Sequence, residues 1–84
     1  MFPKKLDNAN VLYFTDKGYY DTIRYADGRI YDYILYLAIC TYDNNDGFYL
    51  FGCNANKEVI SDYLCDTIEE CINIYQNIEW RSAK

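Results

Sequence analysis

The stretch Gly47–Trp80, GFYLFGCNANKEVISDYLCDTIEECINIYQNIEW, decides the fold. Its first part holds two apolar, aromatic-rich segments separated by the polar tetrapeptide Asn54-Ala55-Asn56-Lys57, a pattern typical of two antiparallel strands joined by a tight turn. The later apolar residues recur at helical spacing; they are Ile68, Cys71, Ile72, Tyr75 and Ile78. The stretch predicts strands near residues 48–53 and 58–64 and a helix over residues 67–79.

The start of this helix carries its own signals. Asp66 is expected to be the N-cap with Glu69 at the third helical position, a variant of the capping box. Glu69 and Glu70 also suit the positive end of the helix dipole. Because its apolar residues form one stripe, the helix is expected to pack on one face of the sheet.

Upstream, glycine and Asx residues mark three further turns: Thr15–Gly18, Asp27–Gly28 and Asn44–Gly47. The segments between them predict strands near residues 10–14, 19–26 and 29–42. The chain is therefore predicted to be a single α+β domain over residues 1–84. Its architecture would be an antiparallel meander sheet of about five strands with one C-terminal helix packed on one face.

Composition favours a binding surface over a deep pocket. A chain of 84 residues is short for enclosing a large internal cavity, and its eleven tyrosines can lie half exposed. The formal net charge of -5 disfavours direct binding of nucleic acid, which needs clustered Lys and Arg. A basic partner fits this charge; the acidity could equally serve solubility alone.

Catalytic and metal-binding patterns are missing from the sequence. There is no histidine, so Ser-His and Cys-His arrangements are excluded. The cysteines lack zinc-type spacing; they are Cys40, Cys53, Cys65 and Cys71. A loop at residues 44–47 would place Cys40 opposite Phe51 and diagonal to Cys53, about 7 Å away and beyond disulfide range. We expect reduced, buried thiols, no metal, no cofactor and no enzyme activity.

The sequence gives no membrane or export signal. Residues 1–7 lack the apolar segment of a signal peptide. The longest apolar run, residues 34–40, falls well short of the roughly 20 residues of a membrane span. The chain is expected to be cytoplasmic and to have no membrane partner.

The Asp27–Gly28 turn predicts which side chains share a face. A two-residue type I′ turn would set Arg24 opposite Tyr31, Thr22 opposite Tyr33 and Tyr20 opposite Leu35, with all six on one face. The other face would be the core side; it would hold Ile23, Tyr25, Ile30 and Ile34. The first face is thus a candidate aromatic surface.

The strand predicted over residues 29–42 complicates this assignment of side chains to two faces. Its apolar residues Leu35, Leu37 and Ile39 would lie on the same face as the tyrosines. Three explanations remain open at this point. A bulge could shift the register, the far end of the strand could be buried on both sides, or this face could pair with another chain.

The C-terminal unit resembles small bacterial immunity proteins of contact-dependent growth inhibition and related polymorphic toxin systems. Those proteins often end in an aromatic strand, a polar turn, a strand ending in Asp-Ser/Thr, and a Glu-Glu helix that finishes at an aromatic residue. The matching residues are Phe48–Phe51, Asn54–Asn56, Glu58–Ile60, Asp66–Cys71 and Glu79–Trp80. In those proteins an alanine usually follows the two glutamates of the helix, and Cys71 stands at that position here. The resemblance covers roughly residues 47–80.

The resemblance implies an inhibitor that binds a cognate protein toxin in the cytoplasm. A nuclease toxin would have a cationic active site, which an acidic, tyrosine-rich surface could fill. The resemblance transfers no binding residue, so the candidates come from loop-tip acids and the tyrosine face: Tyr20, Arg24, Asp27, Tyr31, Asp32, Tyr33, Asp43 and Asp46. The protein could act as a monomer or homodimer. The alternatives are a nucleic-acid-mimicking anti-defence inhibitor and a homodimeric structural or accessory module.

Overall fold

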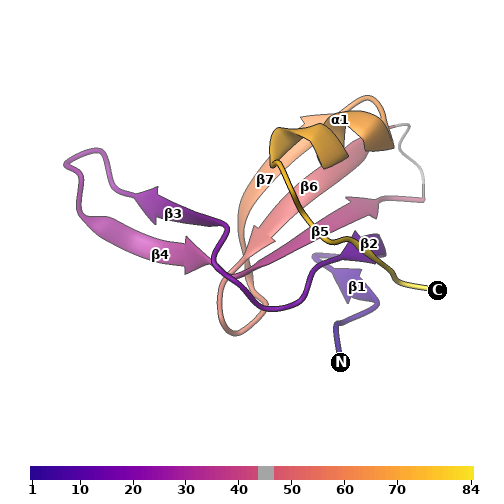
Figure 1. The fold of residues 1–84 in the computed structure, drawn as a ribbon, viewed down its shortest axis with the longest axis horizontal. Coiled ribbons are helices and arrows are strands. Elements are labelled where there is room, and N and C mark those ends of the chain that lie inside the picture. The colour runs from indigo at the N-terminus through magenta and orange to yellow at the C-terminus, as the bar shows by residue number, and fades with distance from the viewer. Residues whose placement is uncertain (44–46) are drawn as a thin grey trace.

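The computed structural model describes residues 1–43 and 47–84 and shows an α+β fold (Figure 1). The main antiparallel sheet has the strand order β1 (Lys5–Leu6), β2 (Ala9–Phe14), β5 (Tyr36–Thr41), β6 (Phe48–Cys53) and β7 (Val59–Cys65). A short strand, β8 (Arg81–Ser82), pairs with β2. One C-terminal helix, α1 (Ile68–Ile74), packs against β6 and β7. This confirms the predicted fold class.

The expected strand over residues 29–42 is divided at Leu35. Its first part, β4 (Ile30–Ile34), pairs with β3 (Asp21–Arg24) in a separate two-stranded sheet. The Leu35 amide donates to Cys53 O at 2.8 Å and its carbonyl accepts from Gly18 N at 2.9 Å, so the chain changes sheets without losing backbone hydrogen bonds. The β3–β4 hairpin, residues 19–34, consequently projects from the sheet as an arm (Figure 1).

The main sheet has buried side chains on both faces. The helix side holds a cluster of Ile34, Leu37, Ile39, Leu50, Cys65 and Cys71. The other side holds Leu6, Ala9, Val11, Ala38, Cys40, Phe51 and Cys53. Burial on both sides therefore accounts for the unbroken apolar run along β5. This was one of the three explanations for the apolar residues that share a face with the tyrosines.

The helix is shorter than predicted and begins one residue later. It spans seven residues, and its N-cap is Thr67, not Asp66: Thr67 Oγ1 accepts from Glu70 N at 3.2 Å. The chain leaves the helix at Tyr75 in an extended conformation and then turns at Asn77, where φ is 60°. This exit carries the C-terminal segment back to β2 through β8, a tertiary contact that overrides the helical periodicity.

A glycine positions the base of the arm. Gly52 in β6 faces Ile34, whose side chain is almost fully buried. A Cβ at residue 52 would lie 2.7 Å from Ile34 Cδ1 and 3.1 Å from Cγ1 and Cγ2. Glycine is thus required for β4 to approach the sheet this closely.

Candidate partner-binding surface

The arm ends in a three-residue loop that differs from the predicted two-residue turn. Gly28 N donates to Tyr25 O at 2.9 Å, and Tyr25 N donates to Arg29 O at 2.8 Å. Gly28 has a φ of 90°, which a residue without a Cβ adopts easily. The loop is therefore a β-turn followed by a glycine bulge, the usual arrangement for hairpin loops of three residues.

A second bulge, at Tyr31, compensates for the extra loop residue. Arg24 pairs with Ile30 and not with Tyr31 as predicted, whereas the predicted pair of Thr22 with Tyr33 is present. The register shifts between Ile23 and Arg24, so one strand residue is left without a partner. The extra loop residue shifts the pairing by one residue, and the bulge at Tyr31 shifts it back. The predicted register is therefore restored toward the base of the arm.

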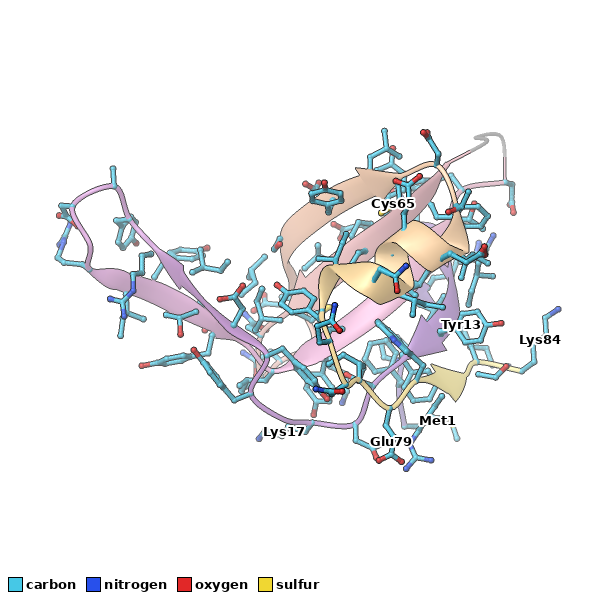
Figure 2. All side chains as sticks on the ribbon, turned by 45° about the horizontal axis from the view of Figure 1, so that its top comes forward. Met1, Tyr13, Lys17, Cys65, Glu79 and Lys84 are labelled. Carbon is cyan, nitrogen blue, oxygen red and sulfur yellow. The ribbon has the colours of Figure 1, made fainter. Side chains whose placement is uncertain are left out.

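The exposed tyrosines of the arm form two edge-to-face pairs. The rings of Tyr25 and Tyr31 lie 5.4 Å apart at 80°, and those of Tyr19 and Tyr33 lie 6.3 Å apart at 65°. All four side chains are exposed, from 43% for Tyr33 to 66% for Tyr19. Such pairs hold one another in position, so the arm presents ordered aromatic area to solvent (Figure 2).

This arrangement corrects the predicted division into faces. Tyr25 and Ile30 were expected to be core, yet they are 50% and 45% exposed because the distal arm has no layer packed against it. Tyr31 contacts Tyr25, which was expected on the opposite face. Only Ile23 and Ile34 of that set pack into the helix-side cluster.

The charged groups near the arm tip satisfy one another. Asp27 accepts hydrogen bonds from Arg29 N at 3.0 Å and Arg29 Nε at 2.7 Å. The Arg29 guanidinium also lies 5.2 Å from the centre of the Tyr25 ring. Arg24 Nη1 donates to Gly28 O at 2.8 Å. These contacts are exposed and contribute little to stability, but they fix the shape of the tip.

Two of the predicted contact residues instead anchor the arm. Tyr20 is half-buried against the helix-side cluster, and its hydroxyl donates to Asp16 O at 2.8 Å. Asp32 is half-buried and accepts from Asn54 Nδ2 at 3.2 Å. Tyr75 adds a third link, because its hydroxyl donates to Asp21 Oδ2 at 3.0 Å. The base of the arm is therefore tied to the sheet and the helix.

The remaining acids of the predicted surface are not brought together with the arm tip. Asp43 is exposed and accepts a 2.6 Å hydrogen bond from Asn10 Nδ2. It follows β5, whose C-terminal end lies at the opposite end of the sheet from the arm (Figure 1). Asp46 lies outside the described residues. The structure thus gathers Arg24, Asp27 and Tyr31 near the tip, with Tyr33 closer to the base.

Three surface residues were not predicted from the sequence; they are Tyr19, Tyr25 and Ile30. Each is at least 45% exposed. A signal for Tyr25 and Ile30 was present, because the charged residues Arg24, Asp27 and Arg29 surround them in the sequence. A hairpin tip flanked by charges is seldom covered by core.

The four cysteines are free and buried, as predicted. Cys40 pairs with Tyr49 and not with Phe51, because the β5–β6 register differs by two residues from the predicted one. Burial raises the pKa of Cys40 and of Cys53 to about 12 and also raises that of Cys71. These thiols are protonated at neutral pH and are poor nucleophiles.

Residues 1–43 and 47–84 contain no group of three or more side chains suited to holding a metal ion. In the same residues, no helix has the length and apolarity needed to cross a membrane. Comparison with protein-family models, with curated proteins and with solved structures gives no match.

Proposed function

We propose that this chain is an immunity protein that binds and neutralises a cognate bacterial toxin, using the arm as its principal contact. The observation that carries the proposal is the exposed tyrosine pair of Tyr25 and Tyr31 at the end of a projecting hairpin. Tyrosine provides large contact area at a low entropic cost, which makes it frequent among binding hot spots.

The geometry of the arm supports tight binding. Its base is held by Ile34 in the core and by hydrogen bonds from Asn54 and Tyr75. Its tip charges are paired within the arm, so few polar groups must lose hydration without compensation. A partner would therefore meet a preorganised aromatic edge.

The net charge supports a cationic partner. At -5, the chain would be attracted over long range to a nuclease active site, which is positively charged because it holds phosphates. The nuclease assignment rests on this charge and on the family resemblance of residues 47–80. The toxin would be encoded next to this chain, as the C-terminal domain of the upstream reading frame.

The test is coexpression of that toxin domain with and without this chain, followed by binding measurements on the purified pair. We expect the chain to restore growth and to protect plasmid DNA from degradation. Replacing Tyr25 and Tyr31 together with alanine should weaken binding by about 30-fold or more, which corresponds to at least about 2 kcal/mol at a hot spot.

The matched control is Tyr63→Ala, since Tyr63 lies on β7 and is 58% exposed. It should leave the affinity within about twofold, as most surface contacts outside a hot spot do. Equal weakening by both variants would reject the arm as the principal contact. Failure of the unmodified chain to protect cells would reject the immunity function.

A second candidate is a homodimeric accessory module, and one observation favours it. Strand β7 lies at an edge of the main sheet, and its residues Tyr63 and Leu64 are 58% and 60% exposed. An exposed apolar edge strand is suited to pairing with another strand. Light scattering at about 100 μM would reveal a dimer of twice the 10.0 kDa chain mass, and Leu64→Lys should dissociate it. A monomer would exclude this candidate.

A further inference from the structure

A hollow on the side of the sheet away from the helix combines aromatic rings with lysines. It is lined by the aromatic residues Phe2, Phe14 and Tyr36, which we call its floor, and by Lys17 and Lys57, which we call its rim. These residues come from the N-terminal segment, from the end of β2, from the β2–β3 loop, from the start of β5 and from the β6–β7 turn. Figure 2 shows Met1, which also lines the hollow, and Lys17 along the same edge of the molecule.

The aromatic floor is ordered by its own contacts. Phe2 and Phe14 stack with ring centres 4.8 Å apart and an interplanar angle of 9°. Phe2 also meets Tyr36 at 5.8 Å. All three residues are half-buried, so part of each ring remains open to solvent. This surface suits a flat aromatic group, which would stack or pack edge-on.

The rim is cationic although the protein as a whole is acidic. Lys57 Nζ lies 5.1 Å from the centre of the Tyr36 ring. Among the described residues that line the hollow, the acid is Asp16, and Arg81 engages it through two hydrogen bonds of 2.8 and 2.7 Å. Within residues 1–43 and 47–84 the ion pairs are Arg29 with Asp27 and Arg81 with Asp16, so both lysines are left for an external anion.

We propose that this hollow binds a small aromatic anion, with its ring against Phe14 and Tyr36 and its carboxylate or phosphate between Lys17 and Lys57. A ring and a charge are both required for binding, because a shallow hollow provides little contact area and lysines in contact with solvent bind anions weakly on their own. This hollow lies outside the arm, and none of residues 19–34 lines it.

Isothermal titration calorimetry at low salt tests the proposal with phenyl phosphate, benzoate, phenol and inorganic phosphate as probes. A dissociation constant on the order of 1 mM is expected for at least one of the two aromatic anions, a value typical for ligands of this size. Phenol and inorganic phosphate should bind at least tenfold more weakly. The comparison of phenyl phosphate with benzoate identifies the preferred anionic group.

Variants test the position of the site. Lys17→Gln and Lys57→Gln should each weaken binding about two- to fivefold, as expected for one exposed charge pair. The matched control is Lys5→Gln, an exposed lysine on β1 that does not line the hollow; it should bind as the unmodified chain does. Amide chemical shifts of residues 14–17, 36 and 57 should move on titration. Equal binding by all three variants, or by inorganic phosphate alone, would overturn the proposal.

Discussion

The substitution Gly52→Ala tests how the arm is joined to the sheet. The new methyl carbon would lie 2.7 Å from Ile34 Cδ1, closer than carbon atoms can approach without displacement. Ile34 is 1% exposed and cannot turn toward solvent. Either Ile34 leaves its rotamer or β4 moves away from β6, and both weaken the packing at the base of the arm.

The magnitude follows from two opposing effects. Overpacking a buried site costs about 1–3 kcal/mol. Replacing glycine with alanine stabilises the folded state relative to the unfolded chain by about 0.4–1 kcal/mol, because the unfolded chain then has fewer backbone conformations to lose on folding. Taking the centres of these two ranges, the net loss is about 1.3 kcal/mol, which lowers the melting temperature of a domain of this size by roughly 5–10 °C.

Urea denaturation of Gly52→Ala, Ile34→Val and the double variant measures the effect. Ile34→Val removes the atom that clashes most severely, so it should cost about 1 kcal/mol alone and clearly less in the Gly52→Ala background. The matched control is Gly47→Ala, whose Cβ would lie 2.8 Å from Leu64 Cδ1. Because Leu64 is 60% exposed and free to rotate, this control should change stability by less than about 0.5 kcal/mol. Additive effects of Gly52→Ala and Ile34→Val would refute the reasoning.

Two further predictions concern the tip and the core. Gly28→Ala places a side chain at a φ of 90° and should cost about 1–2 kcal/mol. Hydrogen exchange of the amides at positions 25 and 28 should accelerate about fivefold or more, while unchanged exchange would argue against the observed turn. The Cys40 and Cys53 thiols stay protonated up to a pKa of about 12, whereas unfolded thiols ionise near 9. Stability should therefore be retained below pH 9 and fall between pH 9 and 12 by about 1.4 kcal/mol per pH unit for each thiol. Urea titrations at several pH values should show that the stability of Cys40→Ala falls less steeply with pH than that of the unmodified chain. An equally steep fall would contradict the burial of that thiol.

The fold was predictable from the sequence where local and tertiary preferences agree. The strands β6 and β7 fall within a residue or two of their predicted positions, since a polar turn separates two apolar segments. The helix was predicted too long because periodicity continues to Ile78, although the chain turns away after Ile74. Pairing of β8 with β2 is a long-range contact that no local pattern records.

The candidate site was predicted only in part, for a similar reason. The assumed two-residue turn placed Thr22 opposite Tyr33 correctly, but it could not reveal two bulges whose register shifts cancel. Nor does alternation show that a hairpin leaves the sheet. That event depends on Leu35, whose backbone groups bond to Cys53 and Gly18, residues distant in the sequence. Consequently Tyr25 and Ile30 carried a core pattern but lie in solvent.

The placement of charge separates two roles within the proposed binding mechanism. Asp27 is paired with Arg29, and Asp32 is bonded to Asn54, so the acids of the arm have their own partners before any complex forms. They are poorly suited to direct ion pairs with a toxin. In this mechanism the net charge of -5 would act instead through the long-range field, which governs the association rate and is screened by salt. The paired rings of Tyr25 and Tyr31 act at contact distance, where buried area governs the dissociation rate. If the arm is the principal contact, salt should therefore change mainly association, and loss of the two rings should change mainly dissociation.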